Sequence, residues 1–428
     1  MTDLLAKTDE RIKNIVRQLQ NAGYETYIVG GAVRDLFLGR PPKDYDISTA
    51  ATPQEIRNVF GRRAARIIGK RFRLVHLMCD GDIIEISTFR RRPASTGAVP
   101  DKLSARGFVP DKMLFEDNDF GTSKEDAFRR DFTVNALFYD PVADKLIDYT
   151  GMGLADIQDQ VVRIIGDGHE RFEEDPVRLL RALKLVGQYG FKLAPETEKA
   201  LRDSIQLIQL AAPSRMALEL EKILISAYSS GIIRAFRQYG FLYYFLPYID
   251  RNWEAAPIQR AMAMLECRNR RVLSGRYRGS VSVAVAAIAL PLVADMHGAT
   301  GEGELWQNNQ DTPEIINSVI RTIFSPHNLI KRVTAASTGM LLNQPVMFNY
   351  SDKTRVKARI LPHARELLYI QNELWWHRSD LIEKWENPGS CDNTSARSRR
   401  RRRRPYRSRR RKDNNTGIQA ALPENTGE

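Results

Sequence analysis

The sequence has few of the residues that build disulfide frameworks and zinc sites. Its 428 residues include only three cysteines, which stand far apart as Cys79, Cys267 and Cys391. The six histidines are scattered as well, and none stands at metal-ligand spacing from another. Structural zinc sites and disulfide scaffolds both require paired spacings. The composition therefore argues against either, and it predicts a reducing, cytoplasmic environment.

Long apolar runs are also missing. Residues 1–16, "MTDLLAKTDERIKNIV", carry charges throughout and lack the apolar segment of a signal peptide. The most apolar stretch, residues 280–296, contains a proline. Only about 15 of its residues are uninterrupted by charge, whereas a membrane span needs roughly 20. We therefore expect a buried helix there and no stable membrane insertion.

Positive charge is concentrated near the C-terminus. Residues 397–412, "RSRRRRRRPYRSRRRK", hold 12 basic residues and no acid, and subtracting them from the net charge of +13 leaves +1 for the rest. Such a block repels itself into an extended state. It predicts either a solvated end or, as we favour, an arm that binds a polyanion such as nucleic acid. The block by itself does not distinguish RNA from DNA or acidic lipid. The arginines expected to bind RNA are Arg399, Arg400, Arg401, Arg402, Arg403, Arg404, Arg409, Arg410 and Arg411.

Short strand and helix patterns alternate over residues 1–150. Residues 5–22 have helical apolar spacing, "TYIVGG" predicts a buried strand, and "AVRDLFLG" predicts a helix. Thr52, with Pro53 and Glu55 behind it, predicts a capped helix start. "CDGD" predicts the turn of a hairpin. We therefore expect a mixed α/β unit with a small sheet and covering helices.

Helical spacing dominates the chain after about residue 164 and continues to about residue 385. Beyond that point the composition becomes simple and polar. The expected domains are an α/β head at 1–150, a helical region at 151–270, a helical C-terminal domain at 271–385 and a disordered tail at 386–428.

The stretch "RPPKDYDISTA" places two aspartates, Asp44 and Asp46, at the start of a predicted strand. Alternate residues of a strand face the same side, so the two carboxylates come close together. Like charges at that separation are costly unless a cation lies between them. Mg²⁺, held by one or two carboxylates plus substrate phosphates, is the natural partner. A purely structural turn is the alternative while the pair is considered alone.

The upstream stretch "VGGAVRD" favours the metal-binding interpretation of Asp44 and Asp46 over the structural turn. Gly30 and Gly31 stand between a predicted strand and a predicted helix, where bare backbone N–H groups can approach a phosphate. Arg34 can then pair with phosphate oxygens in bidentate fashion. Two glycines alone predict only a tight turn. Placed shortly before Asp44 and Asp46, they predict a triphosphate pocket beside a metal pair.

Two further stretches supply charged residues to the same predicted site. "EIS" carries Glu85 on the second strand of the hairpin, and "RRDFTVNAL" carries Arg129, Arg130 and Asp131 before another strand. Asp131 is expected to support the metal site, and Arg130 to contact the triphosphate. A solvated helix end is the alternative for the second stretch taken alone.

Four stretches together resemble one known family. "YIVGGAVRDLFLGRPPKDYDIST", "RRDFTVNAL", "IDYTGMGLADIQDQVVRIIGD" and "EEDPVRLLRALKLVGQYGF" are similar to the class II nucleotidyltransferases, the bacterial poly(A) polymerases and CCA-adding enzymes. The resemblance is strong over residues 27–246 and can be followed to about residue 376. It implies an α/β nucleotidyltransferase head, then all-α neck, body and C-terminal domains that carry nucleotide-base and RNA-binding elements.

The resemblance also implies the chemistry. Two Mg²⁺ ions would be held by Asp44 and Asp46, one activating an RNA 3′-hydroxyl and the other holding the triphosphate of the substrate ATP. Asp131 matches the third catalytic acid, and Glu85 is a less certain supporting carboxylate. The implied triphosphate contacts are Gly30, Gly31, Arg34 and Arg130.

The stretch "EEDPVRLLRALK" carries the implied choice of base. Asp175 is a plausible helix cap with Pro176 first in the helix, and Arg178 and Arg181 are expected to share a face away from the core. In the family, the Asp and the Arg of this motif select the base. A carboxylate accepts from an exocyclic amine, and a guanidinium donates to the neighbouring ring nitrogen. Adenine and cytosine present that edge and guanine and uracil do not, so the motif predicts use of ATP, leaves CTP open as a second substrate, and predicts rejection of GTP and UTP.

The choice between poly(A) addition and CCA addition depends on other segments. Residues 67–78, "IIGKRFRLVHLM", resemble a signature of bacterial poly(A) polymerases, and the basic tail suits arbitrary RNA 3′ ends. Residues 90–121 depart from the family where primer preference is set. We expect poly(A) addition to mRNA or other transcripts, with CCA addition to tRNA as the alternative. A catalytically silent RNA-binding protein is disfavoured by the intact set Asp44, Asp46 and Asp131.

Overall fold

In the computed structural model of the protein, the described residues are 7–68, 74–93, 113, 119–350, 356–357 and 359–386. The arginine block, most of segment 90–121 and residues 69–73 of the poly(A) signature lie outside them. The predictions that depend on those segments stay predictions, as do the domain boundaries. Contacts group residues 1–381 and 382–428 as two units, and the fold given below is that of the first.

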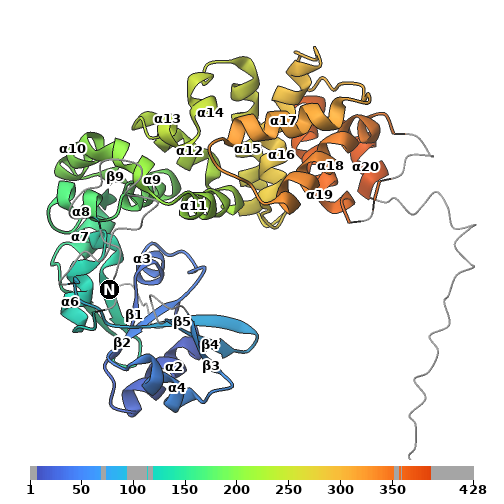
Figure 1. Ribbon diagram of the computed structural model, residues 1–428. Coiled ribbons are helices and arrows are strands. Elements are labelled where there is room, and N and C mark those ends of the chain that lie inside the picture. Colours follow the sequence, from blue (N-terminus) through green and yellow to red (C-terminus); the bar gives the residue numbers. More distant parts are fainter. Residues whose placement is uncertain are drawn as a thin grey trace, which may run out of the picture. The chain divides into compact units, whose positions relative to one another are not determined.

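A mixed sheet dominates the N-terminal part of the chain (Figure 1). Its seven described strands lie in the order β3-β4-β5-β2-β1-β6-β7. They are β1 (Thr26–Val29), β2 (Asp46–Thr49), β3 (Ala65–Ile68), β4 (Leu74–Cys79), β5 (Asp82–Thr88), β6 (Leu137–Asp140) and β7 (Lys145–Asp148). Only the pair of β2 and β5 is parallel among these neighbours. The predicted α/β class is confirmed, as is the hairpin of β4 and β5.

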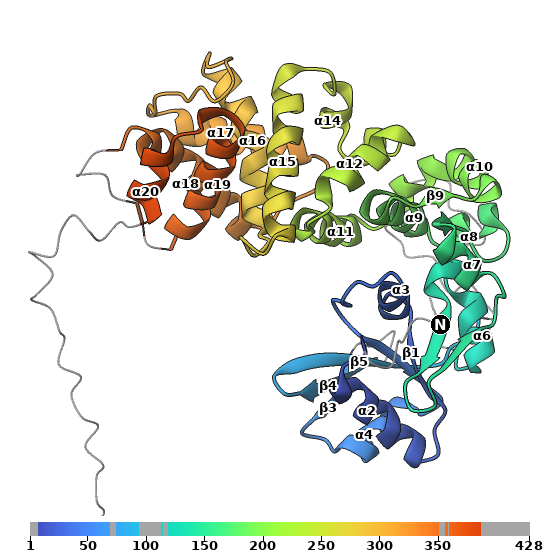
Figure 2. The same ribbon diagram turned by 180° about the vertical axis from the view of Figure 1, so that it is seen from behind.

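Helices pack on the sheet from two sides, with α2 and α4 on one side and α3 on the other (Figures 1 and 2). The helical segments of this part are α2 (Glu10–Asn21), α3 (Gly31–Phe37), α4 (Pro53–Phe60), α6 (Ser123–Arg129) and the 3₁₀ turn η1 (Thr133–Asn135). Within the described residues, the helix predicted at 5–22 begins at Glu10, after an Asp9 cap. The predicted Thr52 cap is confirmed, because Thr52 and Glu55 form a reciprocal capping box.

An aromatic cluster lies under the strand ends that carry the predicted site. Val29, Phe89 and Phe138 are almost fully buried together, with Tyr27 packed against them. The ring centroids of Phe138 and Tyr27 lie 5.9 Å apart in an edge-to-face arrangement. Since Val29 ends β1 and Phe138 lies in β6, this packing fixes the end of β1 from which the chain enters the glycine turn.

The chain is mainly helical after β7. The segments are α7 (Gly153–Gln158), α8 (Gly168–Glu174), α9 (Val177–Tyr189), α10 (Pro195–Ser204), η2 (Ile205–Leu210), α11 (Pro213–Ile225), α12 (Ser229–Gln238), α13 (Leu242–Phe245) and α14 (Pro247–Arg251). A two-stranded parallel sheet of β8 (Val161–Val162) and β9 (Lys192–Leu193) joins them. The change from mixed to helical structure that the sequence predicts is confirmed.

A second group of helices surrounds one apolar helix. The segments are α15 (Ala256–Leu273), α16 (Val281–Met296), α17 (Thr312–Phe324), α18 (Lys331–Phe348), α19 (Leu361–Gln371) and the π-helical η3 (Asn372–Trp376). The last described helix, α20 (Ser379–Glu386), begins in the first unit and ends in the second. Helix α16 packs against α11, α15, α17, α18 and α19, and every residue from Val283 to Ala294 is buried. The buried helix predicted from residues 280–296 is confirmed. Among the described residues, no helix has both the length and the apolar character that crossing a bilayer requires.

Helices α9 and α12 approach each other through two glycines. A Cβ atom placed on Gly187 would lie 2.4 Å from the Ile232 Cα and 2.7 Å from the Gly231 carbonyl oxygen. Both neighbours are backbone atoms, which cannot rotate away as the end of a side chain can. The absence of a side chain at Gly187 therefore allows the two helices to pack at this distance.

Replacing Gly187 by alanine tests that contact. Helix propensity alone favours Gly187→Ala by about 1 kcal/mol. We expect the backbone clash to outweigh this gain and to lower the free energy of unfolding by roughly 1–3 kcal/mol, measured by urea denaturation. Gln238→Ala, at an exposed position of α12, is the control and should change little. A more stable Gly187→Ala protein would show that the helices separate without cost.

Candidate active site

Three neighbouring strands bring the predicted acidic residues together. In the antiparallel pair of β1 and β2, Asp46 lies opposite Val29. In the parallel pair of β2 and β5, it lies opposite Glu85. Paired residues of adjacent strands present their side chains on the same face. The structure thus places the Glu85 carboxylate next to that of Asp46. Asp44 precedes Asp46 by two positions in the chain.

The electrostatics of Asp46 show excess negative charge at this point. Its side chain reaches the surface at the start of β2. Even so, the surrounding protein removes enough water to raise its pKa to about 6, and the charges of Glu85 and Asp44 act in the same direction. The Arg130 guanidinium opposes this rise only in part. Asp44 itself is exposed, and its Oδ2 lies 3.8 Å from the Lys43 Nζ.

Gly30 lies directly against Asp46 and Arg130. Its φ of 73° is in the left-handed region that favours glycine. A Cβ atom there would lie 3.3 Å from Arg130 Nη1 and 3.8 Å from Asp46 Oδ2. Asp126 Oδ2 accepts hydrogen bonds from Arg130 Nη2 at 2.9 Å and Nε at 3.2 Å, and Ser48 Oγ accepts one from Nη2 at 3.3 Å. The structure therefore brings Gly30, Asp46 and Arg130 together.

Arg34 lies beside Gly31, but protein groups already bind its guanidinium. A Cβ atom on Gly31 would lie 3.3 Å from Arg34 Nη2. The guanidinium donates to Asp35 Oδ1 at 3.0 and 2.8 Å, to Asn135 Oδ1 at 2.6 Å and to the Tyr189 hydroxyl at 2.6 Å. This network joins α3 to the end of α9. The triphosphate role of Arg34 stays a prediction.

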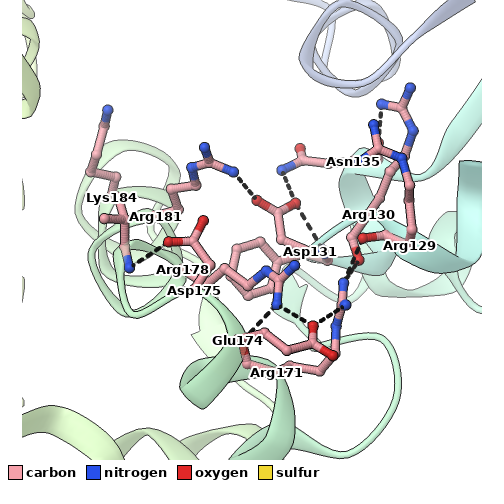
Figure 3. A network of polar contacts seen from close by, with 12 residues as sticks. Arg129, Arg130, Asp131, Asn135, Arg171, Glu174, Asp175, Arg178, Arg181 and Lys184 are labelled. Atoms are coloured by element: carbon pink, nitrogen blue, oxygen red, sulfur yellow. Dashed lines mark hydrogen bonds and ion pairs between the residues drawn. The ribbon is translucent and has the colours of Figure 1, made fainter. Parts of the chain in front are cut away.

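Asp131 lies among polar partners from its own stretch and from α9 (Figure 3). It accepts from the Phe132 N–H at 2.9 Å and from Asn135 Nδ2 at 3.5 Å, and its Oδ2 lies 3.3 Å from Arg181 Nη1. Burial opposes its ionisation, but the charges of Arg181 and Arg178 together with these hydrogen bonds lower its pKa below the usual value. Its predicted part in metal binding stays a prediction.

Glu174, which is 1% exposed, is the centre of a cluster of arginines (Figure 3). Its Oε2 accepts from Arg171 Nη1 at 2.6 Å and from Arg178 Nη1 at 2.8 Å, while Oε1 pairs with Arg92. Arg171 also donates to the carbonyl oxygens of Arg129 and Arg130, at 2.6 and 2.7 Å. Burial and the charge of Arg178 lower the pKa of Arg171 to about 10. Glu174 thus connects α8 with α9, and through Arg171 it connects both helices to the "RRD" stretch, residues 129–131.

The structure corrects two details of the predicted base-selection helix. Helix α9 begins at Val177, so that Pro176 and not Asp175 occupies the cap position, while Asp175 Oδ1 accepts from the Val177 N–H at 3.1 Å. The expectation that Arg178 and Arg181 share a face away from the core is wrong for Arg178. That residue is only 8% exposed because Glu174 and the Arg171 carbonyl bind its guanidinium.

Some residues of the site have no signal in the sequence pattern. Tyr189, Arg171 and Arg215 contact the predicted site residues Arg34, Arg130 and Asp175 across 155, 41 and 40 positions of the chain, respectively. Contacts of that kind follow from packing and leave no periodic trace. Asn135 is different, because it lies within the quoted stretch "RRDFTVNAL" and could have been considered with it.

Comparison with known proteins shows to which family the chain belongs. Residues 26–163 match the family described as "Poly A polymerase head domain". Residues 190–252 match "Probable RNA and SrmB- binding site of polymerase A". Poly(A) polymerase I of Haemophilus influenzae is 31% identical over 422 residues, which cover 93% of this chain and 90% of that protein. The chain belongs to the family of poly(A) polymerases and CCA-adding enzymes.

CCA-adding members of this family are also similar to the chain. The CCA-adding enzyme of Bacillus licheniformis is 34% identical over 255 residues, 58% of each chain. The solved structure of the Bacillus stearothermophilus CCA-adding enzyme in complex with CTP has a TM-score of 0.61 and 23% identity, and covers 88% of this chain and 81% of that one. The structural likeness establishes a shared fold. Members of the family are RNA nucleotidyltransferases, and this enzyme class holds for the chain.

The predicted pair of Asp44 and Asp46 is chemically suited to the hard divalent cations of nucleotidyl transfer. Its donors are carboxylate oxygens, and the charges of Glu85 and Asp44, which add to the effect of burial in raising the pKa of Asp46, are ones that a cation would offset. No group of three His, Cys, Asp or Glu side chains in the described part of the chain is arranged to enclose a metal ion. The assignment of a cation to Asp44 and Asp46 therefore stays a prediction.

Replacing Asp46 by asparagine should reveal what its negative charge costs the fold. The folded protein holds a proton on Asp46 up to about pH 6, whereas the unfolded chain loses it near the ordinary pKa of 3.8. Ionisation therefore costs the metal-free fold stability as pH rises through this window. In EDTA, Asp46→Asn should match the wild type below about pH 4 and be more stable by about 1 kcal/mol at pH 7.5, after allowance for solvent screening.

Thermal unfolding from pH 4 to 8 measures this difference. Asp159→Asn, at an exposed position, is the control and should show no such trend. Adding Mg²⁺ at pH 7.5 should stabilise the wild type more than Asp46→Asn. Parallel pH profiles for the two proteins would contradict the interpretation of Asp46 as a desolvated carboxylate.

Proposed function

We propose that the protein is a template-independent polymerase that adds AMP from ATP to RNA 3′ ends. The observation that carries the proposal is the register of β1, β2 and β5, which sets Asp46 beside Glu85 and against Gly30 and Arg130. Paired carboxylates, a guanidinium and a glycine turn are what metal-assisted transfer from a triphosphate requires. Family membership supports the same reaction class.

Each residue of this group has a distinct role in the proposal. Asp44 and Asp46 hold Mg²⁺, which when bound lowers the pKa of the attacking hydroxyl and neutralises charge on the triphosphate. Glu85 strengthens the negative field at Asp46 and thereby favours cation binding. Arg130, oriented by Asp126, offers N–H groups to phosphate oxygens, and Gly30 keeps that approach free of side-chain atoms.

Base choice is assigned to Asp175 and Arg178. Asp175 accepts from the exocyclic amine, and Arg178 donates to the adjacent ring nitrogen. Both contacts of Arg178 with Glu174 and Arg171 use Nη1, so Nε and Nη2 have no partner among the described residues. The fixed Nη1 orients the guanidinium before a nucleotide arrives, which reduces the entropy cost of binding.

Poly(A) addition is favoured over CCA addition by three features. Similarity to the poly(A) polymerase I of Haemophilus influenzae extends over 93% of the chain. Residues 67–78 resemble the poly(A) signature, and the arginine block suits capture of unrelated RNA 3′ ends. The corresponding biological role is 3′ polyadenylation in RNA turnover in the cytoplasm. CCA addition to tRNA remains the second candidate, because CCA-adding enzymes are similar over 58% of the chain.

Primer extension distinguishes the two candidates. Purified protein with Mg²⁺ and ATP, with or without CTP, should build a long adenylate ladder on an unstructured RNA oligomer. Asp46→Asn should abolish the ladder because the metal site loses a carboxylate, while Asp159→Asn should retain it. Extension restricted to a tRNA lacking its last nucleotides, and stopping after CCA, would establish the second candidate. An Asp46→Asn protein with full activity would disprove the metal assignment.

The arginine block gives a separate prediction. Deleting residues 395–428 should weaken RNA binding and flatten its dependence on salt, because up to 12 cations would no longer release counterions. The measurement is the slope of log K against log salt for a fluorescent oligomer. A chain whose block is replaced by a Gly-Ser segment of equal length is the control for tail length. An unchanged slope would mean that the block does not bind RNA.

A further inference from the structure

One arginine outside the predicted motif binds the residue assigned to base selection. Arg215 Nη1 donates to Asp175 Oδ1 at 2.9 Å, and Arg215 Nη2 donates to Asp175 Oδ2 at 2.8 Å. This is the two-pronged geometry of an arginine–carboxylate pair, which fixes the plane of the carboxylate as well as its position. The Asp175 side chain is 20% exposed and that of Arg215 44%.

The position of Arg215 is not explained by the stability of its own helix. It lies in the first turn of α11, where the helix macrodipole is positive and a cation is unfavourable. That turn holds no acidic residue, and no side chain caps it. An acidic or a neutral residue would stabilise the helix more at this position. The ion pair with Asp175 therefore explains why an arginine stands here.

The hydrogen bonds of Asp175 leave one oxygen available. Oδ1 already accepts from the Val177 N–H at 3.1 Å and from Arg215, whereas Oδ2 accepts from Arg215 alone among the described residues. A carboxylate oxygen can accept about two hydrogen bonds. Oδ2 is therefore the atom that can take the exocyclic amine of an incoming base.

We propose that Arg215 is a positioning residue that determines nucleotide specificity by holding Asp175 as a carboxylate that can only accept hydrogen bonds. The inference rests on the proposed function, in which Asp175 contacts the base. Adenine and cytosine offer an amine donor to such an acceptor. Guanine and uracil offer a carbonyl oxygen at the corresponding place, and this oxygen binds only a donor. A protonated Asp175 would be such a donor and would weaken the discrimination, which would then depend on the Arg178 contact alone.

The charges around Asp175 agree with this role. Burial favours its neutral form, and three guanidinium groups oppose it: Arg215 from α11, and Arg181 and Arg178 from α9. Together they lower the pKa of Asp175 below its usual value. Arg181 also pairs with Asp131, and Arg178 also pairs with Glu174. Arg215 has its ion pair with Asp175 alone among the described residues.

Nucleotide choice as a function of pH tests the proposal. Single-nucleotide addition to an RNA oligomer is measured with ATP, GTP and UTP from pH 6 to 8.5, and the ratio of kcat/KM values is compared at each pH. The ratio cancels pH effects on the metal site that all nucleotides share. The wild type should prefer ATP throughout. Arg215→Met should accept GTP and UTP increasingly as pH falls, by about tenfold for each unit that the pKa of Asp175 rises.

Two further variants serve as controls. Arg215→Lys keeps the charge but not the two-pronged geometry, and it should restore the preference for ATP in part. Arg234→Ala removes an exposed arginine that pairs with Glu266, and it should leave the ratio unchanged. Since Arg215→Lys changes little in volume or charge, it keeps the test available if Arg215→Met does not fold.

Other outcomes would overturn the inference. Unchanged ratios at every pH, with a lower melting temperature for Arg215→Met, would reduce the pair to a structural contact. Unchanged ratios of kcat/KM together with a lower KM for ATP would mean that the nucleotide has to displace Arg215 from Asp175 in order to bind. In both cases the variants still add AMP, so the proposed function stands. A wild type that adds no nucleotide to any RNA would refute the proposed function and this inference together.

Discussion

The parallel pairing of β2 with β5 is the constraint on which the acidic site depends. The other neighbours in the described sheet are antiparallel, and this one pair sets Asp46 directly beside Glu85. The antiparallel neighbour β1 adds the turn at Gly30. Backbone hydrogen bonds thus hold Asp46 and Glu85 side by side, and their repulsion adds to the effect of burial in raising the pKa of Asp46.

A second constraint lies in the buried arginines between the "RRD" stretch and α9. Arg171 donates to the carbonyl oxygens of Arg129 and Arg130 and pairs with Glu174, which also binds Arg178. Removing one member of a buried ionic network leaves an uncompensated charge, which is strongly unfavourable. The backbone of the "RRD" stretch, which carries Arg130, is therefore connected through Arg171 and Glu174 to Arg178 of α9.

Local chemistry explains the parts of the structure that the sequence predicted well. The capping box of Thr52 and Glu55 needs only neighbouring residues. The turn at Asp80 and Gly81 joins two alternating runs into a hairpin. The unbroken apolar run of α16 permits only burial. The pair of Asp44 and Asp46 is different, because β2 begins at Asp46 and Asp44 lies before the strand, so the shared face expected from strand periodicity stays a prediction.

The sequence by itself therefore determined the mixed head, the helical region after it, and the residues that carry the family resemblance. Only the tertiary structure decided how their side chains are paired. Arg178 fits an amphipathic helix whether it faces solvent or Glu174, and packing alone buries it. Arg215 binds Asp175 across 40 positions of the chain. Such pairings depend on which helices pack together, and this is decided by the summed burial of many apolar side chains rather than by any short stretch of sequence.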